Sequence, residues 1–132
     1  MKKTIIGLSA IVALTGSVMA AANNIGVSVQ TGSVQILTDT KGMSLYTFDK
    51  DTAGISNCYD GCEVKWPVYH ADLTTLPKEV KGKDFSTITR KNGAMQTTYK
   101  GKPLYYFFKD TKPNQTNGNG AKGVWHLVEI AK

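Results

Sequence analysis

The chain has 132 residues, a size that suits a signal peptide followed by one domain. Its formal net charge is +6, from 16 basic and 10 acidic residues. The lysines are spread over predicted turns and strand ends instead of forming a run, so we expect no nucleic-acid partner.

Residues 1–20 have the pattern of a signal peptide. Lys2 and Lys3 precede an apolar run, and Val18-Met19-Ala20 provides the small residues of a cleavage site. We expect cleavage after Ala20, with cleavage after Ala22 as the alternative. A membrane anchor is not expected, because the apolar run is too short to cross a bilayer core of about 30 Å. Residues 21–132 are then a single β-domain without a membrane span, located in the periplasm or secreted.

Short runs rich in Val, Ile, Thr, Tyr and Phe, separated by Gly and Asn, predict an all-β domain. Asn92-Gly93 predicts a type I′ hairpin turn, and Lys41-Gly42 and Lys100-Gly101 predict further turns. The polar Gly/Asn-rich segment 112–123 predicts a mobile loop. The expected strands are Val34–Asp39, Met43–Phe48, Ser86–Lys91, Ala94–Tyr99, Pro103–Phe108 and Gly123–Ile130.

One segment of the sequence occurs twice. Residues 41–52 (KGMSLYTFDKDT) return as residues 100–111 (KGKPLYYFFKDT), and the same offset carries Trp66 onto Trp125. Such an offset indicates one duplicated supersecondary unit, which we place at about 34–69 and 93–128. Each copy alone would expose an apolar face. We therefore predict a compact antiparallel sandwich or small barrel built from two duplicated β-meander repeats.

The repeated motif allows two interpretations. Because side chains alternate along a strand, the motif Tyr and Phe share one face, and the Asp that follows the strand can hold the exit turn by accepting backbone N–H bonds. The first interpretation is an aromatic core with a turn-holding Asp. The second is a pair of equivalent ligand pockets. The residues concerned are Tyr46, Phe48, Asp51, Trp66, Tyr105, Phe107, Asp110 and Trp125.

At these residues the chain resembles a bacterial family, the secreted repeat of unknown function, whose members include predicted lipoproteins with a Tyr-x-aromatic-x-x-Asp motif. The segments 46–51 and 105–110 fit that motif, and Cys58, Cys62 and Trp66-Pro67 are similar to the family's Cys-containing loop and Trp-Pro. The resemblance implies an exported, duplicated β-domain and no particular activity. The chain has no cysteine near the cleavage site, so membrane anchoring through a lipid is not implied.

Cys58 and Cys62 are the only cysteines, and export favours joining them in a structural disulfide. Asp60 and Glu63 would raise a thiol pKa there, which disfavours a reactive thiolate. The alternative is a redox or copper-handling site that uses Cys58, Cys62, His70 and His126.

Other catalytic signatures are absent from the sequence. The string Gly118–Gly123 matches Gly-x-Gly-x-x-Gly, but a strand and not a helix is expected after it, which excludes a nucleotide site. No serine has a nucleophile-elbow context. We therefore predict a non-enzymatic monomer without a cofactor or metal, which binds a small ligand or an envelope component. A cryptic enzyme with its pocket between the repeats is a further alternative.

Overall fold

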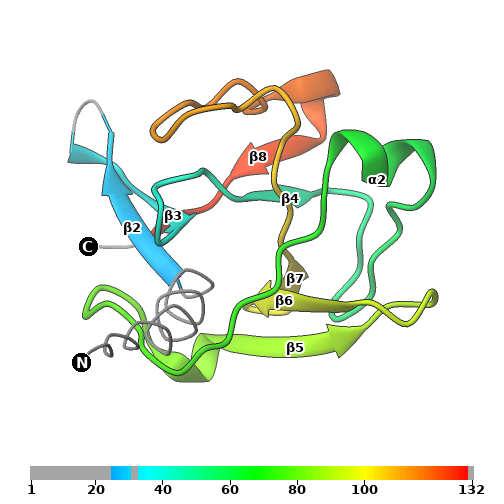
Figure 1. The fold of residues 1–132 in the computed structure, drawn as a ribbon, viewed down its shortest axis with the longest axis horizontal. Coiled ribbons are helices and arrows are strands. Elements are labelled where there is room, and N and C mark those ends of the chain that lie inside the picture. The colour runs from blue at the N-terminus through cyan, green and yellow to red at the C-terminus, as the bar shows by residue number, and fades with distance from the viewer. Residues whose placement is uncertain (1–24, 31–32, 131–132) are drawn as a thin grey trace, which may run out of the picture.

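The computed structural model describes residues 25–30 and 33–130, so the predicted signal peptide lies outside the described residues (Figure 1). Three short helical segments occur in the described part of the chain: α2 (Gly61–Lys65), η3 (Gly82–Asp84) and η4 (Ala121–Gly123). No helix in that part is long and apolar enough to cross a membrane.

The described strands form three antiparallel sheets, which confirms the all-β fold class. The sheets do not close into a barrel, so the barrel alternative does not apply. The first sheet has the order β2-β3-β9, the second pairs β4 with β8, and the third has the order β5-β6-β7. In Figure 1 the β2–β3 and β5–β6 hairpins lie at two edges of the domain, and β4 crosses its middle. The strands are β2 (Ile25–Val29), β3 (Gln35–Asp39), β4 (Tyr46–Phe48), β5 (Phe85–Thr89), β6 (Met95–Tyr99), β7 (Lys102–Pro103), β8 (Trp125–Leu127) and β9 (Glu129–Ile130).

The two copies are related by an approximate two-fold axis that passes between Tyr46 and Tyr105. The backbone N–H of Tyr46 donates to the carbonyl of Tyr105 at 2.8 Å, and the reverse bond measures 3.0 Å. A residue that pairs with its own counterpart in this way lies beside a two-fold axis. Both side chains are fully buried, so the two tyrosines occupy equivalent environments, as the duplication predicts.

The correspondence extends to β2 and β5, which lie before the predicted repeat boundaries. In one copy Ile25 pairs with Asp39, and in the other Phe85 pairs with Tyr99. The sequence prediction missed β2. At Gly26 in this strand, an added Cβ would lie 2.4 Å from the carbonyl oxygen of Asp39, so the close backbone approach requires glycine.

The two copies use different turns at the same place. Lys100 and Gly101 have φ of 50° and 85° and connect the paired residues Tyr99 and Lys102, as in a type I′ turn. The first copy has three residues between Asp39 and Met43, which pair through the Asp39 N–H. A residue before this turn in the first copy therefore corresponds to the residue 60 positions later in the second copy. A residue after the turn corresponds to the residue 59 positions later.

The predicted type I′ turn at Asn92-Gly93 is wrong. Gly93 has a φ of 88°, but Asn92 does not have a positive φ. The Gly93 N–H donates to the carbonyl of Arg90, and the Arg90 N–H donates to that of Ala94. This is a three-residue hairpin loop with a left-handed glycine. The Asn92 side chain instead accepts the N–H of Ala94 at 3.1 Å.

Two apolar clusters lie on opposite faces of the motif strands, as the alternation of side chains predicts. Leu45 and Leu104 belong to a cluster that the β2–β3 and β5–β6 hairpins share, whereas their neighbours Tyr46 and Tyr105 belong to a second cluster. The buried residues of the second cluster are Tyr46, Cys58, Trp66, Tyr105 and Trp125. This second cluster carries the repeated motif.

Candidate ligand-binding groove

Each motif tyrosine bonds to the motif aspartate of the other copy. Tyr46 Oη donates to Asp110 Oδ2 at 2.6 Å, and Tyr105 Oη donates to Asp51 Oδ2 at 2.7 Å. The tyrosine and the aspartate of the motif therefore meet across the two-fold axis, a contact that the sequence did not predict. The four groups bond to one another inside the protein, and this arrangement favours the interpretation as core over the interpretation as two ligand pockets.

Both aspartates also hold the exit turn, which confirms the predicted role. Asp51 Oδ1 accepts the N–H of Asn57 at 2.6 Å, and Asp110 Oδ1 accepts that of Asn117 at 2.9 Å. The asparagine side chains donate to the equivalent carbonyls of Lys50 and Lys109. The second copy thus has one more residue between Asp and Asn, so the constant offset seen in the sequence does not hold through this loop.

Burial changes the pKa values of these groups. It raises the pKa of Tyr46 and Tyr105 well above their usual value, so both remain protonated donors. Burial also raises the pKa of Asp51, although the hydrogen bonds from Tyr105 and Asn57 and the charge of Arg90 lower it. The tyrosine hydroxyls therefore serve as permanent hydrogen-bond donors in the core.

Four aromatic rings form a continuous row across the axis. Trp66 and Trp125 stack with their centroids 3.7 Å apart and their planes 2° apart. Phe48 extends the row beyond Trp125, with centroids 4.2 Å apart, and Phe107 extends it beyond Trp66, with centroids 4.3 Å apart. Both indoles are buried, as the interpretation of the repeated motif as an aromatic core predicts, and the phenylalanines are half-buried. The row joins the two copies and has the axis at its centre.

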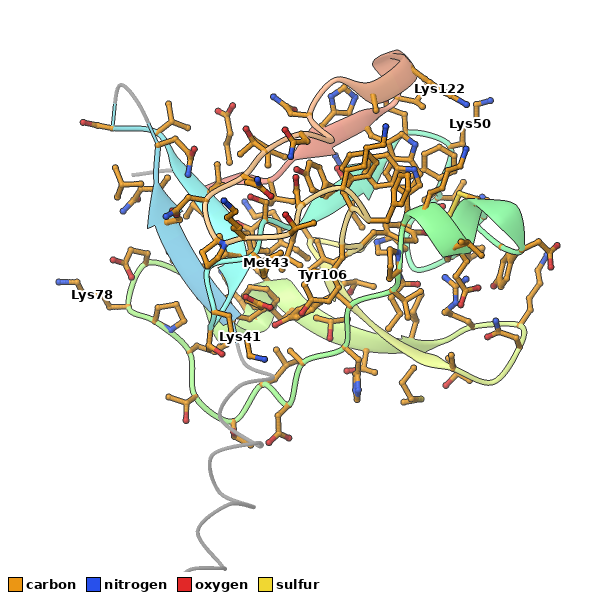
Figure 2. The ribbon with its side chains drawn as sticks, turned by 45° about the horizontal axis from the view of Figure 1, so that its top comes forward. Lys41, Met43, Lys50, Lys78, Tyr106 and Lys122 are labelled. Atoms are coloured by element: carbon orange, nitrogen blue, oxygen red, sulfur yellow. A yellow bond between two sulfur atoms is a disulfide. The ribbon has the colours of Figure 1, made fainter. Side chains whose placement is uncertain are left out.

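A groove with a volume of about 520 Å³ lies along this aromatic row. Its lining includes residues of α2 and of η4, and the exposed ring of Phe108 adds apolar surface. Four lysines belong to the lining, whereas no carboxylate of the described residues does. In Figure 2, Lys50 and Lys122 of this lining lie close together at one corner of the molecule. The lining is Phe48, Lys50, Gly61, Cys62, Lys65, Trp66, Phe107, Phe108, Lys109, Ala121, Lys122, Val124 and Trp125.

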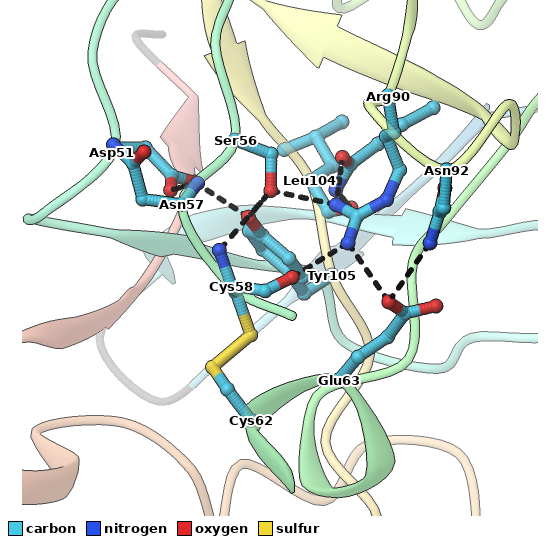
Figure 3. Close-up of a disulfide and its surroundings, with 11 residues drawn as sticks. Asp51, Ser56, Asn57, Cys58, Cys62, Glu63, Arg90, Asn92, Leu104 and Tyr105 are labelled. Carbon is cyan, nitrogen blue, oxygen red and sulfur yellow. Dashed lines mark hydrogen bonds and ion pairs between the residues drawn. A yellow bond between two sulfur atoms is a disulfide. The ribbon is translucent and has the colours of Figure 1, made fainter. Parts of the chain in front are cut away.

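Cys58 and Cys62 form the predicted disulfide, with their Cα atoms 5.3 Å apart (Figure 3). Cys58 is fully buried in the second cluster, and Cys62 lies in the groove lining at the start of α2. The bond therefore ties α2 to the aromatic core. A structural rather than redox role remains a prediction.

The sequence analysis missed Arg90, whose side chain is fully buried and bonds to the loop that contains the disulfide (Figure 3). Its guanidinium donates to the carbonyl of Cys58 at 2.5 Å and to Glu63 Oε1 at 2.9 Å. It also donates to Ser56 Oγ at 2.6 Å and to Gln96 Oε1 at 2.8 Å. A buried guanidinium needs several acceptors, and these four come from the disulfide loop, α2 and β6. Only its position beside a Gly-containing hairpin turn is visible in the sequence.

The structure does not bring the four residues of the alternative metal site together. The two cysteines are joined to each other, His70 is exposed, and His126 Nε2 lies 2.8 Å from Asp49 Oδ2. Among the residues that the structure describes, no group of three or more His, Cys, Asp or Glu side chains could hold a metal ion.

Comparison with known families gives one match. The sequence model of a family described as a secreted repeat of unknown function matches twice, at residues 27–69 and 86–129. These two segments contain the two copies that the hydrogen bonds relate, including parts of β2 and β5. No curated protein and no solved structure matches the chain.

Proposed function

We propose a ligand-binding role for this chain, which belongs to the family of secreted repeats of unknown function. In this proposal the protein is a non-enzymatic module that is exported to the periplasm or beyond. The groove along the aromatic row binds a small anionic molecule that has a flat apolar part.

The observation that carries the proposal is the composition of the groove lining. Aromatic side chains form its apolar surface, four lysines surround that surface, and no described carboxylate belongs to the lining. Flat apolar groups pack well on aromatic faces and edges, and ammonium groups favour an anionic ligand over a neutral one. A volume of about 520 Å³ lies within the range of small-molecule sites. A small ligand is therefore preferred over a large envelope component.

The arrangement of polar groups supports binding over catalysis. The buried tyrosines of the motif bond to its aspartates, and none of these four residues belongs to the groove lining. The described lining holds no carboxylate or imidazole that could exchange a proton with a bound molecule.

Titration calorimetry with matched probes tests the proposal. The exported chain is titrated with naphthoate and with its neutral analogue naphthalene methanol, at low and at high salt. We expect naphthoate to bind more tightly, and added salt to weaken only naphthoate, because exposed ionic contacts are screened. Equal binding of the two probes at both salt concentrations would contradict the proposal.

Two variants locate the binding. Lys50→Ala with Lys109→Ala removes one groove lysine close to Phe48 and one close to Phe107. Lys78→Ala with Lys83→Ala removes two exposed lysines outside the lining, and Figure 2 shows Lys78 on another side of the domain. Naphthoate affinity should fall by up to about fivefold in the first variant and stay unchanged in the second, because one exposed ionic contact contributes at most about 1 kcal/mol. Equal effects of the two substitutions would show that only the overall charge matters.

The redox function remains a second candidate because Cys62 lies in the groove lining, where a thiol could reach it. A structural disulfide of an exported protein has a reduction potential below about −300 mV. A potential near that of thiol oxidoreductases, together with labelling of both cysteines without reductant, would favour the redox function over the binding module.

A further inference from the structure

We infer that the ligand of the groove carries anionic groups at both of its ends, separated by a flat apolar middle. This inference rests on the proposed binding function and adds the charge distribution of the ligand. It follows from the way in which the four lysines are placed about the two-fold axis.

The first pair of lysines lies near the Phe48 end of the aromatic row. Lys50 follows Phe48 by two residues. The N–H of its neighbour Asp49 donates to the carbonyl of Val124 at 2.8 Å, which brings Lys122 of η4 to the same end. In Figure 2 the two lysines point outward at one corner of the molecule. Each copy therefore contributes one lysine to this end.

The second pair lies near the Phe107 end. Lys109 follows Phe107 by two residues, and the N–H of Phe108 between them donates to the carbonyl of Lys65 at 2.9 Å. Lys65 belongs to α2 in the first copy, and Lys109 belongs to the second copy. Because the axis exchanges Phe48 and Phe107, the two lysine pairs stand on opposite sides of it.

The two pairs do not simply repeat one another. Lys50 and Lys109 are counterparts, since Asn57 and Asn117 bind their carbonyls in the same way. The counterpart of Lys65 is Val124, however, and the position that corresponds to Lys122 holds Glu63, which bonds to Arg90. Each copy therefore has one lysine that its counterpart lacks, and as a result each end of the row has two positive charges.

None of the four lysines has a carboxylate at ion-pair distance in the described part of the chain. Asp49 pairs with His126. Two lysine pairs with an aromatic surface between them complement a molecule with two anionic ends.

Three probes of related shape test the inference by calorimetry at low salt. They are naphthoate, the naphthalene dicarboxylate with its two groups at opposite ends of the ring system, and the isomer with both groups side by side. The opposite-ended dicarboxylate should bind about fivefold more tightly than naphthoate, because it gains a second exposed ionic contact. It should also bind more tightly than the side-by-side isomer, which has the same charge.

Paired substitutions show whether both ends are used. Lys50→Ala with Lys122→Ala should lower the affinity for the opposite-ended dicarboxylate to that of naphthoate, and so should Lys65→Ala with Lys109→Ala. Naphthoate itself should keep its affinity within about twofold in either variant, because it can use the remaining end.

The control removes the same charge elsewhere. Lys78→Ala with Lys83→Ala, two exposed positions outside the groove lining, should leave all three affinities unchanged. Equal binding of naphthoate and both dicarboxylates, weakened by the groove substitutions, would overturn the inference and leave the binding function standing. Binding of none of the probes would overturn both.

Discussion

The two copies hold the same loop beside the motif in different ways. After the asparagine that binds the motif aspartate, the first copy has Cys58, which is crosslinked to α2. The second copy has Gly118 at that place, where an added Cβ would lie 2.8 Å from the ring of Trp66. One fold unit can therefore fix this loop either by a covalent bond or by close packing of a glycine against the aromatic row.

The hairpins that precede the two motifs also differ in the side-chain bonds that their loops make. In the second copy Arg90 starts the loop of the β5–β6 hairpin, and Gln30 has the same position and backbone bonds in the β2–β3 hairpin. Among the described residues, the Gln30 side chain hydrogen-bonds to Ser28, whereas Arg90 joins the disulfide loop and α2 to β6. The two copies share the frame of the fold, but the loop of the first copy that contains the disulfide is held by more side-chain bonds.

The largest expected effect concerns the aromatic row, to which both copies contribute. Replacing Trp66 or Trp125 with Ala should lower the free energy of unfolding by about 3–5 kcal/mol in each case, because each indole is buried in the same ring row. Urea unfolding measures both values, with Phe108→Ala at an exposed ring as the control. A difference between the tryptophans of more than about 2 kcal/mol would break the equivalence of the copies.

The next effect separates the two hairpins. Arg90→Ala should cost about 3 kcal/mol of unfolding free energy, since it leaves the Cys58 carbonyl and Gln96 Oε1 without their charged donor. The matched change Gln30→Ala should cost less than about 0.5 kcal/mol. Similar losses in the two variants would mean that the buried guanidinium has no special role.

Removing the disulfide should have a smaller and more local effect. Replacing Cys58 and Cys62 with Ala should cost about 2 kcal/mol, because the bond closes only a short loop. Hydrogen exchange should become faster in residues 55–66 and stay unchanged in residues 114–125, which occupy the corresponding place in the second copy without a crosslink. Faster exchange in both segments would show that the copies unfold together and do not differ locally.

The smallest effect is a pH dependence from Asp51. Burial raises the pKa of this carboxyl above its usual 3.8, so its contribution to stability is complete below pH 3.8 and is lost as the pH rises through the raised value. The unfolding free energy of the wild type, measured relative to Asp51→Asn, should therefore fall as the pH increases from below 3.8 toward neutrality. A difference that grows with pH would contradict this assignment.

The sequence contains enough information to predict the duplication, the all-β class, the disulfide and the burial of both tryptophans. It does not show that Tyr46 bonds to Asp110, because each tyrosine has an aspartate of its own copy five residues later, and only the packing of the copies decides between them. The positive φ at Lys100 was also hidden, since asparagine and not lysine is the residue expected there.

Residues 112–123, the segment predicted as a mobile loop, make contacts that could not be predicted from the sequence. Its composition is polar and rich in Gly and Asn, yet Asn114 N–H donates to the carbonyl of Gly42, and Ser44 Oγ donates to that of Gln115 at 2.7 Å. These bonds reach a distant part of the sequence, which composition cannot reveal. The groove was missed for a similar reason, because Lys50 and Lys122 come together only in three dimensions.

The most direct test of the account is a nitrogen–proton correlation NMR spectrum recorded while the opposite-ended naphthalene dicarboxylate is added. We predict that the indole N–H signals of both Trp66 and Trp125 shift together, along with the backbone signals of residues 107–109 and 121–124, because one ligand would lie across the axis in the groove. The signals of the β5–β6 hairpin should stay in place. Shifts confined to one copy, or centred on that hairpin, would contradict a binding groove shared by the two repeats.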